Sequence, residues 1–112
     1  MQERRKIERI HLIHYLRMFN RKDGSLIGNL VDITEEGIQF ICENPLEKET
    51  ILQVRMDFPE EFMGLNFLEF DVEIKWCKVD QNPDLFAVGC KLLNIKSSEV
   101  EVIQALIDMY RD

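Results

Sequence analysis

Two short stretches of the sequence carry side chains that could bind a charged ligand. Arg5 and Arg9 lie four residues apart, directly before an apolar run. Residues 32–37 read Asp-Ile-Thr-Glu-Glu-Gly and place an acceptor, a hydroxyl and a glycine where a second apolar run ends. A guanidinium donates paired hydrogen bonds to a phosphate or carboxylate, which a lysine ammonium cannot do. Each stretch alone is common in proteins, so neither is decisive by itself.

The distribution of charge agrees with a site for a charged ligand. The net charge is −7, but residues 1–22 hold seven Lys or Arg against two Glu, so they carry +5 and the remainder carries −12. A basic arm on an acidic body favours capture of a small anion over binding along a polyanion, because the body would repel a long phosphate backbone. On charge alone, a basic tail that merely offsets an acidic surface is an equal alternative.

Composition and length predict one ordinary globular domain. The chain has 112 residues, 46% of them hydrophobic and 31% charged, which is enough for a single core without cross-links. No apolar run is long enough to span a bilayer, and the N-terminus lacks the apolar core of a signal peptide. Cys42, Cys77 and Cys90 are odd in number and form no Cys-x-x-Cys pair, so we expect neither a disulfide framework nor a zinc site. The expected compartment is the reducing cytoplasm.

Most of the chain alternates apolar and polar residues, the pattern of strands with one buried face. Asp23-Gly24 and residues 80–84 are hairpin turn signals, Gly37 turns the chain between strands, and Pro59 is expected to end a strand. In the first segment Ile7, Ile10, Ile13 and Leu16 recur every third residue, which also fits a helix. The expected strands cover residues 10–19, 26–33, 38–42, 52–58, 68–76 and 86–92.

The end of the chain predicts a helix over residues 98–111. Ser98 and Glu101 form a candidate capping box, and an apolar stripe follows at helical spacing. About six strands separated by turn signals predict a small antiparallel β-barrel, because closure removes exposed strand edges, with the helix packed at one opening. The fold class is therefore mostly β. The stripe consists of Val100, Ile103, Leu106, Ile107 and Tyr110.

The order of the two stretches resembles the PilZ domain family, bacterial receptor modules for the second messenger cyclic di-GMP. That family has an Arg-x-x-x-Arg stretch, matched here by Arg5 and Arg9, followed by Asp/Asn-x-Ser-x-x-Gly at the end of a strand. Asp32, Thr34 and Gly37 match the second motif, with Thr in place of the usual Ser. Trp76 and the strand Ala87-Val88-Gly89-Cys90 also resemble features common in the family. The resemblance runs from Arg4 through Ile95 and on to the final helix.

The resemblance implies a single PilZ-type domain over residues 1–112. Its expected parts are a flexible basic arm at 1–9, a β-barrel at 10–95 and a helix at 98–111. The implied ligand is cyclic di-GMP, with no other cofactor and no metal. The implied ligand-binding residues are Arg4, Arg5, Arg9, Asp32, Thr34 and Gly37.

The ligand's chemistry assigns a role to each of these residues. Guanidinium forks fit both the O6/N7 edge of guanine and the phosphates. Asp32 suits the N1–H and N2–H donors of guanine, and Thr34 offers a hydroxyl. Gly37 can take a positive φ and lets a flat base approach the backbone. The structural alternative is that Arg5 and Arg9 are solvated charges, while Asp32 and Thr34 bond only to local backbone.

The implied function is a non-enzymatic cyclic di-GMP receptor whose arm orders on binding and whose altered surface is read by a partner protein. By resemblance the partner belongs to motility, pilus or exopolysaccharide machinery, with a role in biofilm formation. An adaptor of the same fold that does not bind the nucleotide is the alternative, because the extra methyl of Thr34 could crowd the ligand. A β-barrel that binds a nucleic-acid polymer is disfavoured by the acidic body, and no membrane insertion is expected.

Other patterns predict little chemistry. His11 and His14 would point to opposite faces of a strand with no third ligand nearby, so a metal site is not expected. Asp71 and Glu73 share a strand face, but that face is full of solvated charge. There is no Ser-His-Asp order and no phosphate-cradling glycine loop, and catalysis is not expected.

Overall fold

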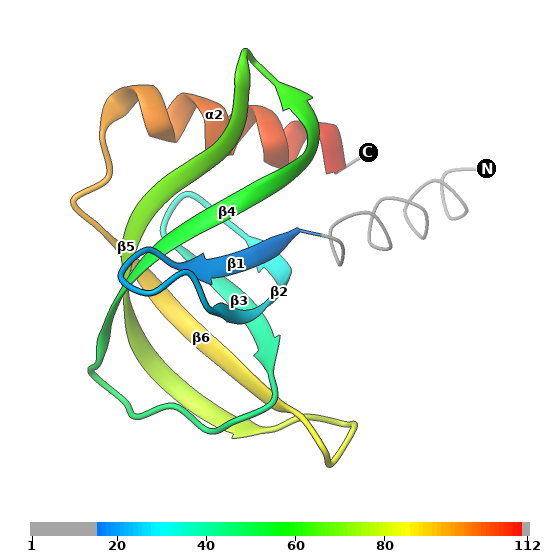
Figure 1. Cartoon of the computed structure of the whole chain (residues 1–112). Helices are drawn as coiled ribbons and strands as arrows, with labels where there is room; N and C mark the ends of the chain where they lie inside the picture. Colours follow the sequence, from blue (N-terminus) through cyan, green and yellow to red (C-terminus); the bar gives the residue numbers. More distant parts are fainter. Residues whose placement is uncertain (1–15, 111–112) are drawn as a thin grey trace.

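The protein is a small β-barrel closed at one end by a helix (Figure 1). The computed structural model describes residues 16–110, with the side chain of Tyr110 excepted. Six strands and one helix follow in order along this part of the chain. They are β1 (Arg17–Asn20), β2 (Leu26–Ile33), β3 (Gly37–Cys42), β4 (Ile51–Phe62), β5 (Leu65–Val79), β6 (Phe86–Leu93) and α2 (Ser97–Tyr110).

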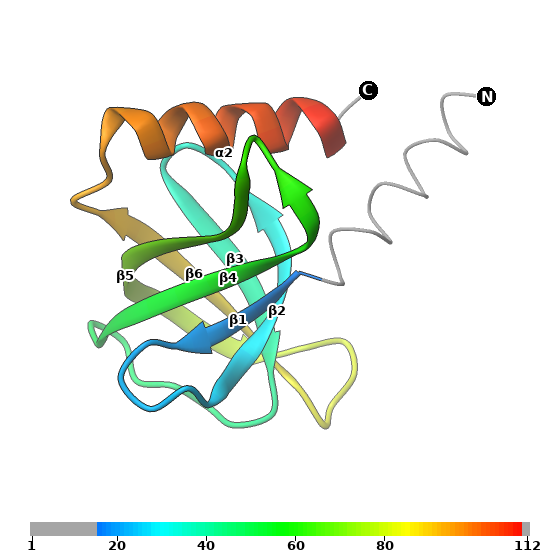
Figure 2. The same cartoon turned by 45° about the horizontal axis from the view of Figure 1, so that its top comes forward.

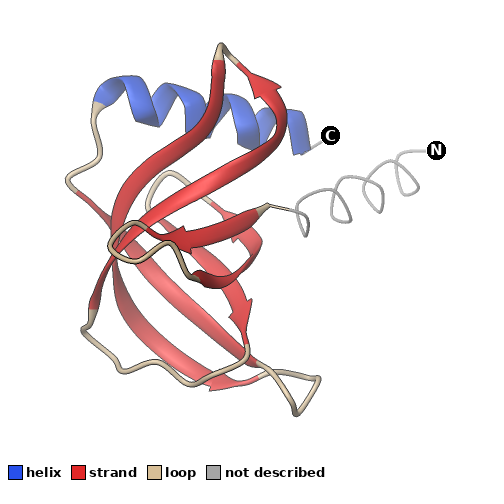
Figure 3. Cartoon of the chain, in the orientation of Figure 1, coloured by secondary structure: helices blue, strands red, loops and turns tan. Residues whose placement is uncertain are grey.

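The strands close in the order β1-β2-β3-β6-β5-β4, and every neighbouring pair is antiparallel. This confirms the predicted mostly β fold, a six-stranded antiparallel barrel with a C-terminal helix. Strands dominate the described residues, as Figure 3 shows. Figure 2 shows α2 lying across one end of the barrel. Closure gives each of the six described strands a neighbour on both sides over part of its length, which limits the edge that another chain could extend.

The core is the inner face of the barrel together with one face of α2. Alternate residues of each strand point inward, as in Val54, Met56 and Phe58 of β4, and are buried. The helix contributes Val102, Ile103, Leu106 and Ile107. No polar or charged side chain within residues 16–109 is buried, so the barrel is held mainly by apolar packing and its ladder of backbone hydrogen bonds.

The predicted turns position the strands. The chain reverses between β1 and β2 at Asp23-Gly24, where Gly24 has a φ of 76°. The Asp23 carboxylate accepts hydrogen bonds from the backbone N–H and the hydroxyl of Ser25, at 2.9 and 2.6 Å. β2 has the predicted bounds, and residues 80–85 join β5 to β6 as expected. β1 begins at Arg17, and residues 10–15 of the predicted first strand lie outside the described part of the chain.

Two local predictions are wrong. β4 does not stop at Pro59 but continues to Phe62, since Pro59 lies in an irregular segment between the pairs Asp57–Phe67 and Phe62–Leu65. A proline that lacks a ladder partner removes no strand hydrogen bond there.

The capping box at Ser98 and Glu101 is also wrong. α2 begins at Ser97, and the Glu99 side chain accepts a 2.9 Å hydrogen bond from the backbone N–H of Lys96. Glu99 therefore supplies the carboxylate half of a capping box two residues earlier than expected. Lys96 cannot supply the other half, because its side chain has no acceptor.

Candidate functional site

The end of β2 and the tight turn that joins it to β3 hold the predicted acceptor, hydroxyl and glycine. The Thr34 hydroxyl accepts hydrogen bonds from the backbone N–H groups of Glu36 and Gly37, at 3.3 and 3.2 Å, and lies 3.3 Å from the Gly37 carbonyl oxygen. The backbone N–H of Thr34 donates to the same carbonyl at 2.9 Å. The hydroxyl therefore caps the turn, and the turn fixes the end of β2 against the start of β3. This local role agrees with the structural alternative given above, in which Thr34 bonds to nearby backbone.

Asp32 stands beside this turn on the outer face of the barrel. Its side chain is exposed, and one carboxylate oxygen accepts a 2.9 Å hydrogen bond from the neighbouring backbone N–H of Ile33. Asp32 is paired with Gln39 of β3, which in turn is paired with Gly89 of β6. Gly89 is paired with Trp76 of β5. The barrel therefore places an aspartate, an amide, a glycine and an indole in one row across four strands.

A glycine is required at position 89 because the Trp76 indole lies against it. A Cβ at Gly89 would lie 2.2 Å from Cε2 and 2.3 Å from Nε1 of Trp76, so the ring lies directly on the Gly89 backbone. The Lys78 ammonium is 5.1 Å from the ring centroid, within the range of a cation–π contact. Trp76 remains 36% exposed. The exposed part of an indole held in this way can contact a flat base.

The predicted reason for Gly37 is wrong in one respect. Its φ is not positive, because Gly37 is an extended residue at the start of β3. A Cβ there would meet the carbonyl oxygen of Cys90 at 2.2 Å. Gly37 is required because β3 and β6 approach closely. The second expectation, that a flat base of the ligand approaches the Gly37 backbone, stays a prediction.

These residues line a shallow pocket of about 430 Å³. Its charged side chains are of both signs, namely Lys75 and Lys91 together with Asp32 and Glu36. Among the described residues Lys91 has no ion-pair partner, whereas Lys75 lies 3.3 Å from Glu73. A pocket with aromatic, acidic and cationic groups can bind a flat base and a phosphate together. The full lining is Asp32, Thr34, Glu36, Gly37, Ile38, Gln39, Lys75, Trp76, Gly89, Cys90 and Lys91.

The sequence reasoning found part of this pocket. Asp32, Thr34 and Gly37 lie together as predicted, and Trp76 and Gly89, which the sequence marked only as features resembling the family, join them. Gln39, Lys75 and Lys91 were missed. Gln39 and Lys91 lie in predicted strands, and the alternation of apolar and polar residues shows that both point outward. It does not show which residues of the neighbouring strands lie beside them. A second candidate cavity, about 540 Å³, lies along β2 and the loop after β3 and contains none of the predicted residues.

Arg4, Arg5 and Arg9 lie outside the described residues, as do His11 and His14. The described chain begins next to β2, where the carbonyl of Leu16 accepts a 2.9 Å hydrogen bond from the backbone N–H of Leu30, two residues before Asp32. Arg9 is seven residues before Leu16, a tether that can span at most about 25 Å when extended.

Burial suppresses the reactivity of the pocket's thiol. Burial, with a smaller contribution from the nearby Cys42 thiol, raises the pKa of Cys90 to about 12. Burial also raises the pKa of Cys42. Both thiols are protonated at neutral pH, so neither is an activated nucleophile. Within residues 16–110 no three His, Cys, Asp or Glu side chains gather to hold a metal ion.

Asp71 and Glu73 do not form a carboxylate pair free for chemistry. The Arg21 guanidinium donates to Asp71, and Lys75 pairs with Glu73. Each acid thus has its own cation, as expected for a solvated strand face. No helix in the described residues is both long enough and apolar enough to cross a membrane.

Comparison with known proteins identifies the family. The model of the PilZ domain matches residues 3–109, nearly the whole chain. No match was found among curated proteins. The match includes both the described barrel and the arginine stretch that precedes it, so the chain belongs to the PilZ domain family.

Solved structures share the fold at low sequence identity. An inhibitor of motility from Bacillus subtilis, MotI/DgrA, has a TM-score of 0.67 and 13% identity, covering 84% of this chain and 46% of its own. The PilZ domain of Escherichia coli YcgR, solved with c-di-GMP, has a TM-score of 0.63 and 16% identity, covering 88% and 83%. K. pneumonia MrkH in its apo state has a TM-score of 0.65 and 13% identity, covering 85% and 45%. This chain thus spans about half the length of MotI/DgrA and MrkH.

Proposed function

We propose that this member of the PilZ family is a receptor for cyclic di-GMP and acts without catalysis. The observation that carries the proposal is the row Asp32, Gln39, Gly89 and Trp76, which brings an acceptor for guanine N–H groups and a partly exposed indole into one pocket. The presence of c-di-GMP in the related PilZ domain of YcgR supports the choice of ligand.

Each part of the ligand has a partner in this proposal. One guanine stacks on Trp76 and donates its N1–H and N2–H groups to Asp32. Lys91, which lacks an ion-pair partner among the described residues, attracts a phosphate. Arg4, Arg5 and Arg9 approach from the N-terminal side and supply guanidinium forks to the phosphates and the O6/N7 edge. Thr34 acts mainly by holding the turn.

Binding then becomes a signal because it ties the basic arm to the barrel. The arm carries repelling cations and few apolar side chains, so the ligand's negative charges give it partners that the barrel alone does not. A partner protein reads the surface that results. By family we propose a cytoplasmic target in motility, pilus or exopolysaccharide machinery.

A second candidate is an adaptor of this fold that does not bind the nucleotide. The observation in its favour is the Thr34 hydroxyl, which already bonds the backbone of Glu36 and Gly37. A fully engaged hydroxyl leaves less for a ligand, and its methyl group occupies space beside the pocket.

Calorimetric titration with cyclic di-GMP, with GTP as the control ligand, separates the two. We expect saturable binding that Arg9→Ala reduces about tenfold or more, because a forked contact contributes about 1–3 kcal/mol of discrimination. Arg9→Lys should be nearly as damaging, since charge remains while the fork is lost. Arg17→Ala, on β1 outside the pocket lining, serves as the matched control.

Asp32→Ala tests the role of the row itself. It should weaken binding and reduce the preference for cyclic di-GMP over cyclic di-AMP, because the acceptor for the guanine N–H groups is gone. Absence of binding by the unaltered protein would instead favour the adaptor.

A further inference from the structure

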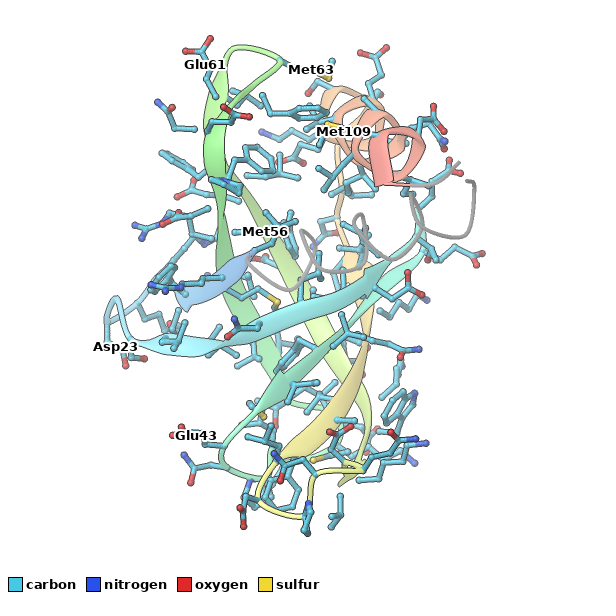
Figure 4. All side chains as sticks on the ribbon, turned by 90° about the vertical axis from the view of Figure 1, so that its right-hand side faces the viewer. Asp23, Glu43, Met56, Glu61, Met63 and Met109 are labelled. Carbon is cyan, nitrogen blue, oxygen red and sulfur yellow. The ribbon has the colours of Figure 1, made fainter. Side chains whose placement is uncertain are left out.

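The hairpin that joins β4 to β5 exposes a group of large apolar side chains. Met63, Leu65 and Phe67 are 57%, 36% and 45% exposed and follow one another at alternate positions. We call these three residues the hairpin-tip surface. In Figure 4 the labelled Met63 lies at the tip of this hairpin, at the same end of the molecule as Met109 of α2, which is 44% exposed. Exposed apolar groups that gather in this way mark interaction sites.

The backbone at the tip gives independent support. Phe62 pairs with Leu65, so Met63-Gly64 is a two-residue loop with φ values of 52° and 77°. Such loops favour Asn, Asp or Gly at both positions, and a methionine with positive φ is uncommon. Met63 is thus held in a strained conformation while its side chain is mostly in water. Neither local stability nor solubility explains a methionine there.

Phe67 is held at the base of this surface. The Arg55 guanidinium lies 5.9 Å from the Phe67 ring centroid and 5.0 Å from that of Phe19, and it also bonds the Asp57 carboxylate at 2.8 Å. A stacked, ion-paired arginine limits the rotamers of the phenylalanine. An exposed aromatic side chain that is already ordered loses little entropy on binding, which suits it to anchor a complex.

The charges around the tip identify the kind of partner. Residues 58–69 contain Glu60, Glu61 and Glu69 and no Lys or Arg, and all three glutamates are exposed. Arg55, beside Phe67 and opposite Glu69, is ion-paired with Asp57, so the surroundings of the tip keep a net negative charge. An anionic bilayer would repel such a tip. A second copy of the same surface would also be repelled, because like charges would face each other. A protein surface with an apolar groove flanked by Lys or Arg is complementary to it.

We propose that the hairpin-tip surface docks into an apolar groove flanked by basic side chains on a partner protein. A signalling receptor needs a surface that contacts its partner, so the assignment of this role to the hairpin-tip surface rests on the proposed function. None of its three residues lines the nucleotide pocket, whose β5 residues Lys75 and Trp76 lie towards the other end of that strand. Nucleotide binding and docking can therefore be measured separately.

The test uses phage-displayed random linear peptides selected on the full chain. Peptides that combine bulky apolar residues with Lys or Arg should be enriched, and a synthetic copy should bind more weakly as salt rises. Met63→Asn and Leu65→Thr should each reduce its affinity about tenfold or more, since central apolar anchors dominate such contacts. Val79→Thr is the matched control, because Val79 is 58% exposed on β5 outside the hairpin-tip surface.

Several results would overturn the docking surface. They are failure to enrich such peptides, unchanged affinity in both variants, and an equal loss in Val79→Thr. Binding of the unaltered protein to vesicles of phosphatidylcholine and phosphatidylglycerol, or self-association in sedimentation, that disappears in Met63→Asn would assign the surface to a membrane or a second copy. Met63→Asn should also raise the melting temperature, because asparagine tolerates positive φ. A lower melting temperature would make Met63 a structural residue.

The two proposals fail in distinguishable ways. Cyclic di-GMP affinity should stay within about twofold in Met63→Asn and Leu65→Thr, because the pocket is untouched. A protein that binds the peptide and not the nucleotide would refute the receptor role and leave the docking surface standing. One that binds only the nucleotide would refute the docking surface.

Discussion

Adding one methyl group at Gly89 tests the central feature of the pocket. A Cβ at this position would lie 2.2–2.5 Å from three atoms of the Trp76 indole. Such distances are far below van der Waals contact, so Gly89→Ala must displace the ring or separate β5 from β6. The indole is at the end of a side chain and the strands are hydrogen-bonded, so we expect the ring to move.

The size of the effect follows from this overlap. Overpacking of one methyl group typically costs about 1–3 kcal/mol. For a domain of this length each kcal/mol lowers the melting temperature by roughly 4 °C, so we expect a fall of about 4–12 °C. The displaced indole should also weaken cyclic di-GMP binding if the stacking proposal is correct.

The chain contains a single tryptophan, so its fluorescence reports on this ring alone. In the unaltered protein the indole is covered by Gly89 and lies near Lys78, and only 36% of the residue is exposed. Gly89→Ala should move the emission maximum to longer wavelength and increase quenching by acrylamide. Thermal melting followed by circular dichroism gives the stability change on the same samples.

A double-mutant cycle provides the control. In a Trp76→Ala background Gly89→Ala should be neutral or stabilise the protein by about 0.5–1 kcal/mol, because the clash is gone and glycine weakens strands. The coupling between the two changes should therefore exceed about 1 kcal/mol. An equal loss of stability in both backgrounds, or unchanged emission in Gly89→Ala, would show that the indole does not lie on Gly89.

Three further predictions concern the turn, a buried thiol and the arm. Thr34→Ser should keep the turn and bind cyclic di-GMP as well or better, and clearly weaker binding by calorimetry would show that the methyl contributes. The pKa of Cys90 is raised to about 12 from 9.0, so the folded state holds this proton more tightly and stability should fall as pH rises from 9 towards 12. When stability is measured by urea unfolding, Cys90→Ala should show a shallower fall over this pH range. Identical pH profiles for the two proteins would contradict this. Amide hydrogen exchange across residues 2–10 should slow only with cyclic di-GMP, and equal exchange with the nucleotide bound would place the signal elsewhere.

The sequence alone determined the class of fold and the position of one motif. Alternation has a period of two residues, which any strand with one buried face must follow, so β2, β3 and β6 were predicted closely. Asp23-Gly24 predicted a hairpin because few other residues adopt the required backbone angles. Thr34 and Gly37 belong to one turn and Asp32 lies two residues before Thr34 at the end of β2, so their proximity needed no tertiary information.

Local signals were less reliable where they competed with the barrel. Pro59 normally ends a strand, yet β4 continues because the irregular pairing at that point requires no hydrogen bond from it. The helix begins at Ser97, ahead of the expected Ser98 cap, because the chain leaving β6 allows Glu99 to bond back to Lys96. Both errors arise because a short local signal does not fix its own structural setting. A proline can lie within a strand where the pairing is irregular, and a helix can begin at any of several neighbouring polar residues.

Only the tertiary structure decided which residues make up the pocket. The row from Asp32 to Trp76 depends on the registers of three strand pairs, two of which contain an irregularity, between Leu30 and Asp32 and between Ile74 and Trp76. One extra residue in a strand changes which side chains face each other across the pair. Alternation shows that Gln39 points outward, but it cannot show that it is paired with Gly89. Those registers are set by packing of the whole barrel, which no local stretch of sequence encodes.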